Sequence, residues 1–160
     1  MDHRYLTVYF SAGGNTERVA QIIAKTLDSR IHKICPREEY TREDLNWRNK
    51  ESRTTVEMSD KSFRPEVINE VVDLEAVETV FLGFPIWWYV APTIVNSFLE
   101  ANGFGGKRIV LFATSGGSGF GKTVQFLKNS VDPDTEIIEG KVFSGKIDEA
   151  EVEEFARNNM

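Results

Sequence analysis

Two short, nearly continuous apolar runs constrain the fold of this chain most strongly: TVFLGF at residues 79–84 and IVLFAT at residues 109–114. Runs of this kind, without regular polar alternation, are typical of strands that are covered on both faces of a parallel sheet. A third run, RYLTVYF at residues 4–10, ends at a glycine-containing turn and is followed by a segment of helical periodicity. The alternation predicts a three-layer α/β domain in which helices cover both faces of a parallel sheet.

The rest of the chain continues this alternation. Further strands are expected at residues 31–35 and 135–143, and helices at 16–28, from Pro65 to about 72, 92–102, 121–130 and 147–158. Residues 36–64, here called the excursion, are charged and aperiodic. We expect them to form a solvated flap, with partial cover of a binding pocket as the alternative. Without a linker or internal repeat, the 160 residues predict a single domain, 1–160.

Composition excludes several classes of protein. With 19 Lys and Arg against 25 Asp and Glu, the net charge of −6 excludes nucleic-acid binding by bulk charge. The single cysteine, Cys35, cannot form an internal disulfide and disfavours a cysteine-based zinc site. No stretch approaches the roughly 18 apolar residues of a membrane span, and no signal-peptide pattern is recognised. We therefore expect a cytoplasmic protein, without a bound metal ion, that is a monomer or a weak dimer.

Three unusual loops follow the three apolar runs, and ligands of open parallel sheets bind at the carboxyl ends of the strands. The first loop, SAGGNT at residues 11–16, leads into a helix whose free N–H groups favour an anion such as phosphate. Gly13 and Gly14 permit close approach of the backbone, while Ser11, Asn15 and Thr16 add side-chain donors. An ordinary strand-to-helix turn with a polar helix cap is the alternative interpretation.

The second and third loops favour a flat ligand. In the second, Pro85 and Ile86 precede Trp87, Trp88 and Tyr89, whose rings could stack on a planar group or cover the end of the sheet. The third loop, residues 114–121, alternates glycine with hydroxyl residues, so its backbone could pass close to a ring and donate to ring carbonyls. The alternative for the third loop is a flexible turn.

Residues 116–123, GGSGFGKT, also match the G-x-x-x-x-G-K-[ST] pattern of nucleotide-triphosphate loops. The match lies late in the chain, and no apolar strand ends in an aspartate that could hold magnesium. A nucleotide triphosphatase using Gly116–Thr123 is therefore kept as the least favoured alternative.

With these loops, the chain resembles the flavodoxin family, in particular bacterial flavodoxin-like proteins with a PIWW and a TSGGSG loop. The resemblance implies a five-stranded parallel sheet in the order 2-1-3-4-5 and bound FMN. It places the FMN phosphate at the first loop, and the isoalloxazine ring and ribityl chain at the second and third loops. The residues implied to bind the cofactor are Ser11, Gly13, Gly14, Asn15, Thr16, Pro85, Ile86, Trp87, Trp88, Thr114, Ser115, Gly116, Gly117, Ser118 and Gly119.

The sequence departs from the family pattern at two places. Gly13 stands where flavodoxins commonly have a threonine, and bulky aromatic residues replace the small residue beside the flavin N5. Strand 135–143 lacks a long interruption, which is typical of short-chain members.

The resemblance favours an FMN-dependent redox carrier that uses its acidic surface to dock on basic-faced redox partner proteins. The alternative is an FMN-dependent NAD(P)H quinone or nitro reductase. No catalytic acid–base group is predicted, because neither His3 nor His32 lies in the three loops.

Overall fold

The computed structural model describes residues 1–69 and 71–160, which form a parallel five-stranded sheet in the order β2-β1-β3-β4-β5. The strands are β1 (Tyr5–Tyr9), β2 (Arg30–Lys33), β3 (Thr79–Pro85), β4 (Arg108–Ser115) and β5 (Glu136–Ser144). The helices are α1 (Asn15–Leu27), α2 (Arg53–Met58), α3 (Thr93–Glu100), α4 (Thr123–Lys128) and α5 (Glu149–Asn158). The predicted sheet order is confirmed, and α1, α3, α4 and α5 lie within or close to their predicted ranges.

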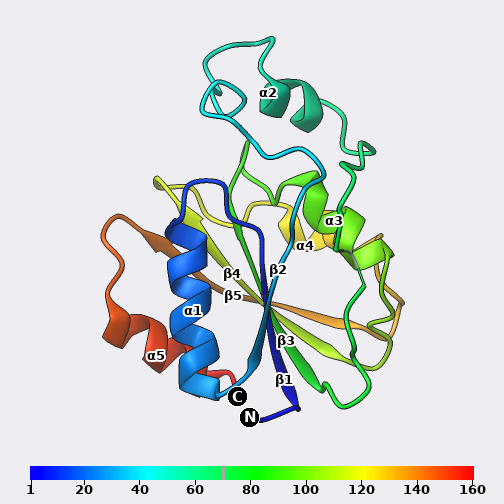
Figure 1. Cartoon of the computed structure of the whole chain (residues 1–160), viewed down its shortest axis with the longest axis vertical. Helices are drawn as coiled ribbons and strands as arrows, with labels where there is room; N and C mark the ends of the chain where they lie inside the picture. Colours follow the sequence, from blue (N-terminus) through cyan, green and yellow to red (C-terminus); the bar gives the residue numbers. More distant parts are fainter. Residues whose placement is uncertain (70) are drawn as a thin grey trace.

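Two separate cores cover the two faces of the sheet. Figure 1 shows α1 and α5 on one side and α3 and α4 on the other. The alternation within β3 explains this division, because Val80 and Leu82 pack toward α3 while Phe81 packs toward α1 and α5. All three side chains are fully buried, as the apolar run at residues 79–84 predicts.

The prediction of a helix from Pro65 to about residue 72 is wrong. The described residues of this segment are not helical, and residue 70 lies outside the described residues. Residues 66–69 instead lie beside residues 33–37, at the carboxyl end of β2 and just beyond it, where Ile68 N–H donates to Cys35 O at 3.0 Å. The Asn69 side chain also donates to Lys33 O at 2.6 Å and accepts from Cys35 N–H at 2.9 Å. The segment thereby supplies partners to backbone groups at the end of this edge strand and in the residues that follow it.

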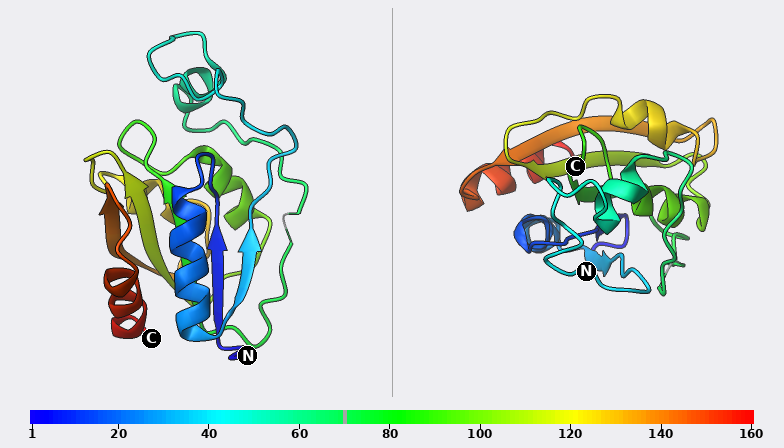
Figure 2. Two further views of the ribbon diagram at one scale, coloured as in Figure 1. Left: turned by 60° about the vertical axis from the view of Figure 1, so that its left-hand side comes forward. Right: turned by 90° about the horizontal axis from the view of Figure 1, so that it is seen from above.

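The excursion carries a short helix, α2, which the sequence did not indicate. Figures 1 and 2 show that α2 covers neither face of the sheet and lies above the edge formed by the carboxyl ends of the strands. Ser52 caps the helix, because its hydroxyl accepts from Thr55 N–H. The excursion is therefore a folded extension at the end of the sheet where ligands are expected.

Strand β5 is continuous apart from a single-residue bulge. Leu111 pairs with Glu139 and Phe112 with Lys141, which leaves Gly140 as the extra residue. A side chain at Gly140 would collide with Leu111 O and the Phe155 ring, so the bulge requires glycine. None of the described helices is long and apolar enough to cross a membrane.

Candidate flavin-binding site

The three loops singled out in the sequence meet at one edge of the sheet. The first joins β1 to α1, the second follows β3, and the third follows β4 (Figure 1). Ile86 N–H of the second loop donates to Thr114 O at 2.9 Å. The hydroxyl groups of Thr16 and Thr114 form a buried hydrogen bond of 2.7 Å between the first and third loops. The loops thus form one connected surface at the carboxyl ends of β1, β3 and β4.

The first loop exposes a helix N-terminus that is lined with glycine. Gly14 occupies the N-cap position of α1 with φ 94°, a left-handed conformation that favours glycine. Its N–H donates to Ser11 Oγ at 3.1 Å, which closes the turn. A side-chain carbon added at Gly13 or Gly14 would meet no atom within 4 Å, so open space lies in front of both residues. This arrangement leaves room for an anion near the positive end of α1.

Thr16 makes a structural contact, and the cofactor contact that the resemblance implies for it stays a prediction. Its side chain is buried, and its hydroxyl is paired with Thr114. This hydroxyl therefore connects α1 to β4, and the exposed donor of the first loop is Asn15.

The second loop is a tight turn with two bulky residues in the left-handed region. Trp87 and Val90 exchange two backbone hydrogen bonds of 2.9 and 3.2 Å. Between them, Trp88 has φ 48° and Tyr89 has φ 69°, as in a type I′ turn, which normally contains Asn-Gly. Each non-glycine residue in this conformation costs about 1–2 kcal/mol. The turn holds both aromatic side chains out from the sheet, with Trp88 36% and Tyr89 71% exposed.

Of the three aromatic residues in the second loop, Trp87 is the one that packs against other aromatic rings of the protein. Its ring packs edge-on against Phe10 at 5.5 Å and against Tyr40 of the excursion at 5.3 Å, measured between ring centroids. Trp87 therefore connects the second loop to the sheet below and to the excursion above.

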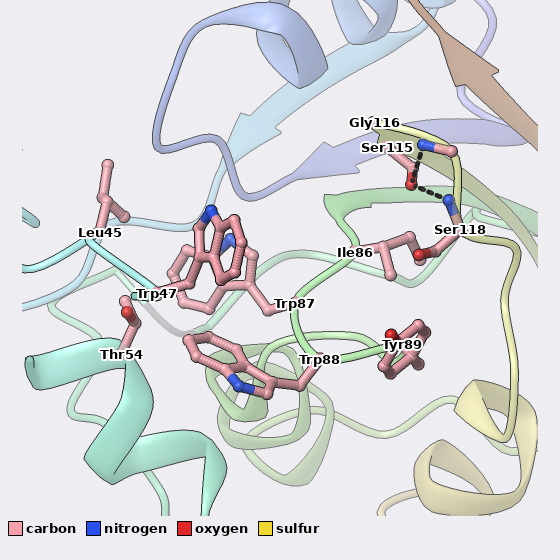
Figure 3. Close-up of a pocket in the computed structure, with 11 residues that line it drawn as sticks. Leu45, Trp47, Thr54, Ile86, Trp87, Trp88, Tyr89, Ser115, Gly116 and Ser118 are labelled. Atoms are coloured by element: carbon pink, nitrogen blue, oxygen red, sulfur yellow. Dashed lines mark hydrogen bonds between the residues drawn. The ribbon is translucent and has the colours of Figure 1, made fainter. Parts of the chain in front are cut away.

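The third loop is organised by one hydroxyl. Ser115 Oγ accepts from Gly117 N–H at 3.1 Å and from Ser118 N–H at 2.8 Å (Figure 3). These two N–H groups donate within the loop, and donation from the loop backbone to the carbonyls of a bound ring stays a prediction. The hydroxyl thus fixes the shape of the loop beside the cavity.

The residues that match the triphosphate-loop pattern can be explained by their role in holding the loops of this protein together. Thr123 is fully buried, and its hydroxyl donates to Phe120 O at 2.5 Å and accepts from Ala91 N–H at 3.1 Å. This hydroxyl is committed to joining the second and third loops, whereas a magnesium-binding hydroxyl must face the ligand. Lys122 is exposed at the start of α4. The geometry thus gives no support to a triphosphate site.

This explanation predicts opposite results for neighbouring residues. Lys122→Ala should leave both stability and FMN affinity unchanged. Thr123→Val should lower the free energy of unfolding by about 1–2 kcal/mol, because it leaves the buried Ala91 N–H without its partner. Urea denaturation measures the stabilities. Loss of a magnesium-dependent ATP hydrolysis in Lys122→Ala would restore the triphosphatase interpretation.

Two adjoining cavities lie between the loops. The larger, of about 460 Å³, is lined by Leu45, Trp47, Thr54, Ile86, Trp87, Trp88, Tyr89 and Ser115–Ser118 (Figure 3). The smaller, of about 340 Å³, is lined by Asn15, Pro85, Ile86, Trp87, Thr114–Gly116, Phe143, Gly145 and Ile147. Four residues line both cavities: Ile86, Trp87, Ser115 and Gly116. The two cavities therefore adjoin at these four residues. The smaller one reaches Asn15 at the start of α1, and the larger one reaches the excursion.

The cavities bring together most of the predicted site residues. Ten of the fifteen line one or both, and the five that line neither are Ser11, Gly13, Gly14, Thr16 and Gly119. Sequence reasoning missed Leu45, Trp47, Thr54, Phe143, Gly145 and Ile147 as lining residues. Phe143 lies at the carboxyl end of β5, and Gly145 and Ile147 follow the strand, so the same rule about carboxyl ends of strands could have indicated them.

The excursion lines the larger cavity, so the expectation of a purely solvated flap is wrong. Tyr40 anchors it: its ring packs against Trp87, and its hydroxyl donates to Glu57 Oε1 at 2.6 Å. Arg53 lies 3.8 Å above the Tyr40 ring and donates to Glu57 Oε2 at 2.9 Å. Burial first, and the hydrogen bond to Glu57 second, raise the pKa of Tyr40 above its ordinary range, so the hydroxyl stays protonated.

Comparison with known proteins agrees with this architecture. The family model for flavodoxin matches residues 4–159. Crystal structures of candidate flavoproteins from Bacteroides uniformis ATCC 8492 and Bacteroides eggerthii DSM 20697 are each 36% identical, with TM-scores of 0.89 and 0.84. They cover 96% and 97% of this chain, and 97% and 96% of their own chains are matched.

A more distant structure shares the fold. The flavoprotein from Lactobacillus acidophilus NCFM in complex with FMN is 19% identical, with a TM-score of 0.67 over 96% of this chain and 98% of its own. No curated protein matches. From the family match over nearly the whole chain, and from the sheet order, this chain belongs to the flavodoxin family.

Proposed function

We propose that this protein binds FMN and transfers electrons through it. The observation that carries the proposal is the pair of adjoining cavities. The smaller one reaches Asn15 at the start of α1, next in the chain to Gly14, which faces open space, and the larger one is an aromatic chamber. FMN has the matching chemistry, because it joins a phosphate to a planar ring through a flexible chain. The Lactobacillus acidophilus flavoprotein, which shares the fold of this chain, was crystallised in complex with FMN.

The residues at both ends fit this cofactor. At the phosphate end, Gly13 and Gly14 face open space, and Asn15 adds a polar side chain. The nearby carboxylate of Glu17 accepts from Tyr9 OH at 2.8 Å, so it is held on the sheet side of α1. At the ring end, Trp88 offers an aromatic surface opposite the glycine-containing third loop.

When bound, FMN supplies one- and two-electron redox chemistry, and the protein supplies binding and electrostatics. The glycine-lined turn and α1 hold the phosphate, while Ser115 keeps the third loop in shape beside the ring. Among the described residues, none that lines the larger cavity is charged. Negative charge on a bound ring therefore meets no lining cation, and the chain's net charge of −6 acts in the same direction. We expect the protein to lower the reduction potential of bound FMN.

A titration of the apo protein with FMN tests the proposal. The chain has three tryptophans, Trp47, Trp87 and Trp88, and all of them line the larger cavity. We therefore expect FMN to quench nearly all tryptophan emission, with a break at equimolar FMN, and to shift the flavin absorbance bands. Riboflavin, which lacks the phosphate, should bind at least about a hundredfold more weakly, because charge-assisted hydrogen bonds at a helix N-terminus are strong. Unchanged emission and absorbance would overturn the proposal.

A further inference from the structure

The outer side of the larger cavity is built by the excursion. Leu45, Trp47 and Thr54 line this cavity and not the smaller one that reaches Asn15. Figure 3 shows these three residues on one side of the cavity and the third loop on the other, with Trp87 between them. The excursion thus forms a wall at the end of the site that is farthest from the phosphate loop.

The aromatic residues around the cavity differ in exposure. Trp87 is half-buried and is held by Phe10 and Tyr40, whereas Trp47 is 66% exposed. A cofactor that stays bound contacts the inner surfaces of a site, and a molecule that exchanges in each cycle must approach from its exposed rim. Trp47 stands at this rim, so it is placed for an exchanging molecule.

Trp47 is fixed in place despite its exposure. Asn49 N–H donates to Asn46 O across the turn that contains Trp47, and Ser52 N–H donates to Asn49 O in the turn that follows, both at 3.1 Å. Thr55 Oγ1 in α2 donates to Asn49 O at 2.9 Å, and Thr54 Oγ1 donates to Asp44 O at 2.7 Å. Successive turns bonded to α2 therefore carry the indole, and α2 is in turn anchored through Glu57 and Tyr40.

The lining of the cavity selects for an uncharged ligand. The described residues that line it are apolar, aromatic, hydroxyl-bearing or glycine, and none of these carries a charge. An ionic group would lose hydration there without gaining a partner, whereas a flat neutral ring would gain stacking and apolar contact. Arg48 lies over the Trp47 ring at 5.1 Å but lines the neighbouring hollow instead of this cavity.

We propose that Trp47 is a binding residue for a second ligand of this site: a small, neutral, planar aromatic molecule of the quinone class. It stacks on the excursion wall beside the cofactor. This inference rests on the proposed function, because the wall faces the chamber assigned to the FMN ring. It names the class of molecule with which the bound cofactor exchanges electrons.

The test uses the oxidised FMN-loaded protein and 2-methyl-1,4-naphthoquinone, so that binding is measured without turnover. Isothermal titration calorimetry gives the quinone dissociation constant for the natural protein, Trp47→Ala, Trp47→Phe and Val56→Ala. Val56 is a matched control, because it is 56% exposed on α2 of the same excursion and does not line the cavity. Trp47→Ala should raise the quinone dissociation constant at least about tenfold. Trp47→Phe should raise it less, and Val56→Ala should leave it unchanged.

A parallel titration with FMN separates this inference from the proposed function. The FMN dissociation constant of Trp47→Ala should stay within about twofold of the natural value. An equal loss of FMN and quinone affinity would assign Trp47 to the cofactor and overturn the inference. So would a loaded natural protein that does not bind the quinone, or a Trp47→Ala variant that binds it normally. Failure of the natural protein to bind FMN would overturn the proposed function itself.

Discussion

Gly14→Leu is expected to abolish FMN binding, with a dissociation constant raised by more than about a hundredfold, while the protein still folds. A side-chain carbon at Gly14 would meet no atom within 4 Å, so the leucine side chain starts out into the open space that is assigned to the phosphate. The left-handed φ of 94° adds a strain of about 1–2 kcal/mol to the folded state. FMN titration by tryptophan emission measures the affinity, and urea denaturation measures the stability.

Two controls separate the phosphate contact from the strain. Gly14→Ala has the same unfavourable φ with much less bulk, so it should lose similar stability but less FMN affinity. Riboflavin carries no phosphate, so its weaker binding should change little in Gly14→Leu. Equal losses for FMN and riboflavin would indicate general disruption of the site. Unchanged FMN affinity would remove the first loop from the proposed site.

The fold was predictable where local pattern and tertiary environment agree. The runs at residues 79–84 and 109–114 are apolar because both faces of β3 and β4 are covered, and this fixed their place within the sheet. The pattern around residues 65–72 resembled a helix, yet Ile68 is 66% and Val71 73% exposed. Here the backbone at and just after the end of β2 decided the outcome, because its polar groups needed partners and the segment supplied them.

The part of the site that follows from the order of strands and helices could be predicted from the sequence. Loops that follow neighbouring strands of a parallel sheet meet at one edge, so their glycine and tryptophan residues could be assigned to one site. Trp47 could not be placed in this way. Its position depends on the packing of Tyr40 against Trp87, two residues far apart in the chain, and on hydrogen bonds within the excursion. Periodicity and turn signals carry no information about such contacts.

The other large effect is expected from replacing the strained turn of the second loop. The stability of the apo protein should rise, and its affinity for FMN should fall. Replacing Trp88 by Asn and Tyr89 by Gly installs the dipeptide that a type I′ turn favours. The apo protein should gain about 1–2 kcal/mol in free energy of unfolding, because both left-handed bulky residues are removed. FMN affinity should fall by more than about tenfold, because the Trp88 wall of the cavity is lost.

The single variants assign these two effects to different residues. Tyr89→Gly should supply much of the gain in stability with a small change in FMN affinity, because this side chain is 71% exposed. Trp88→Phe keeps both the left-handed strain and an aromatic ring, so it should leave stability nearly unchanged and retain most of the affinity. A double variant that is less stable than the natural protein would show that the aromatic side chains stabilise the turn. A double variant that is more stable than the natural protein but binds FMN more weakly would mean that the strained turn lowers stability and serves ligand binding. Strained backbone at binding sites commonly has this role.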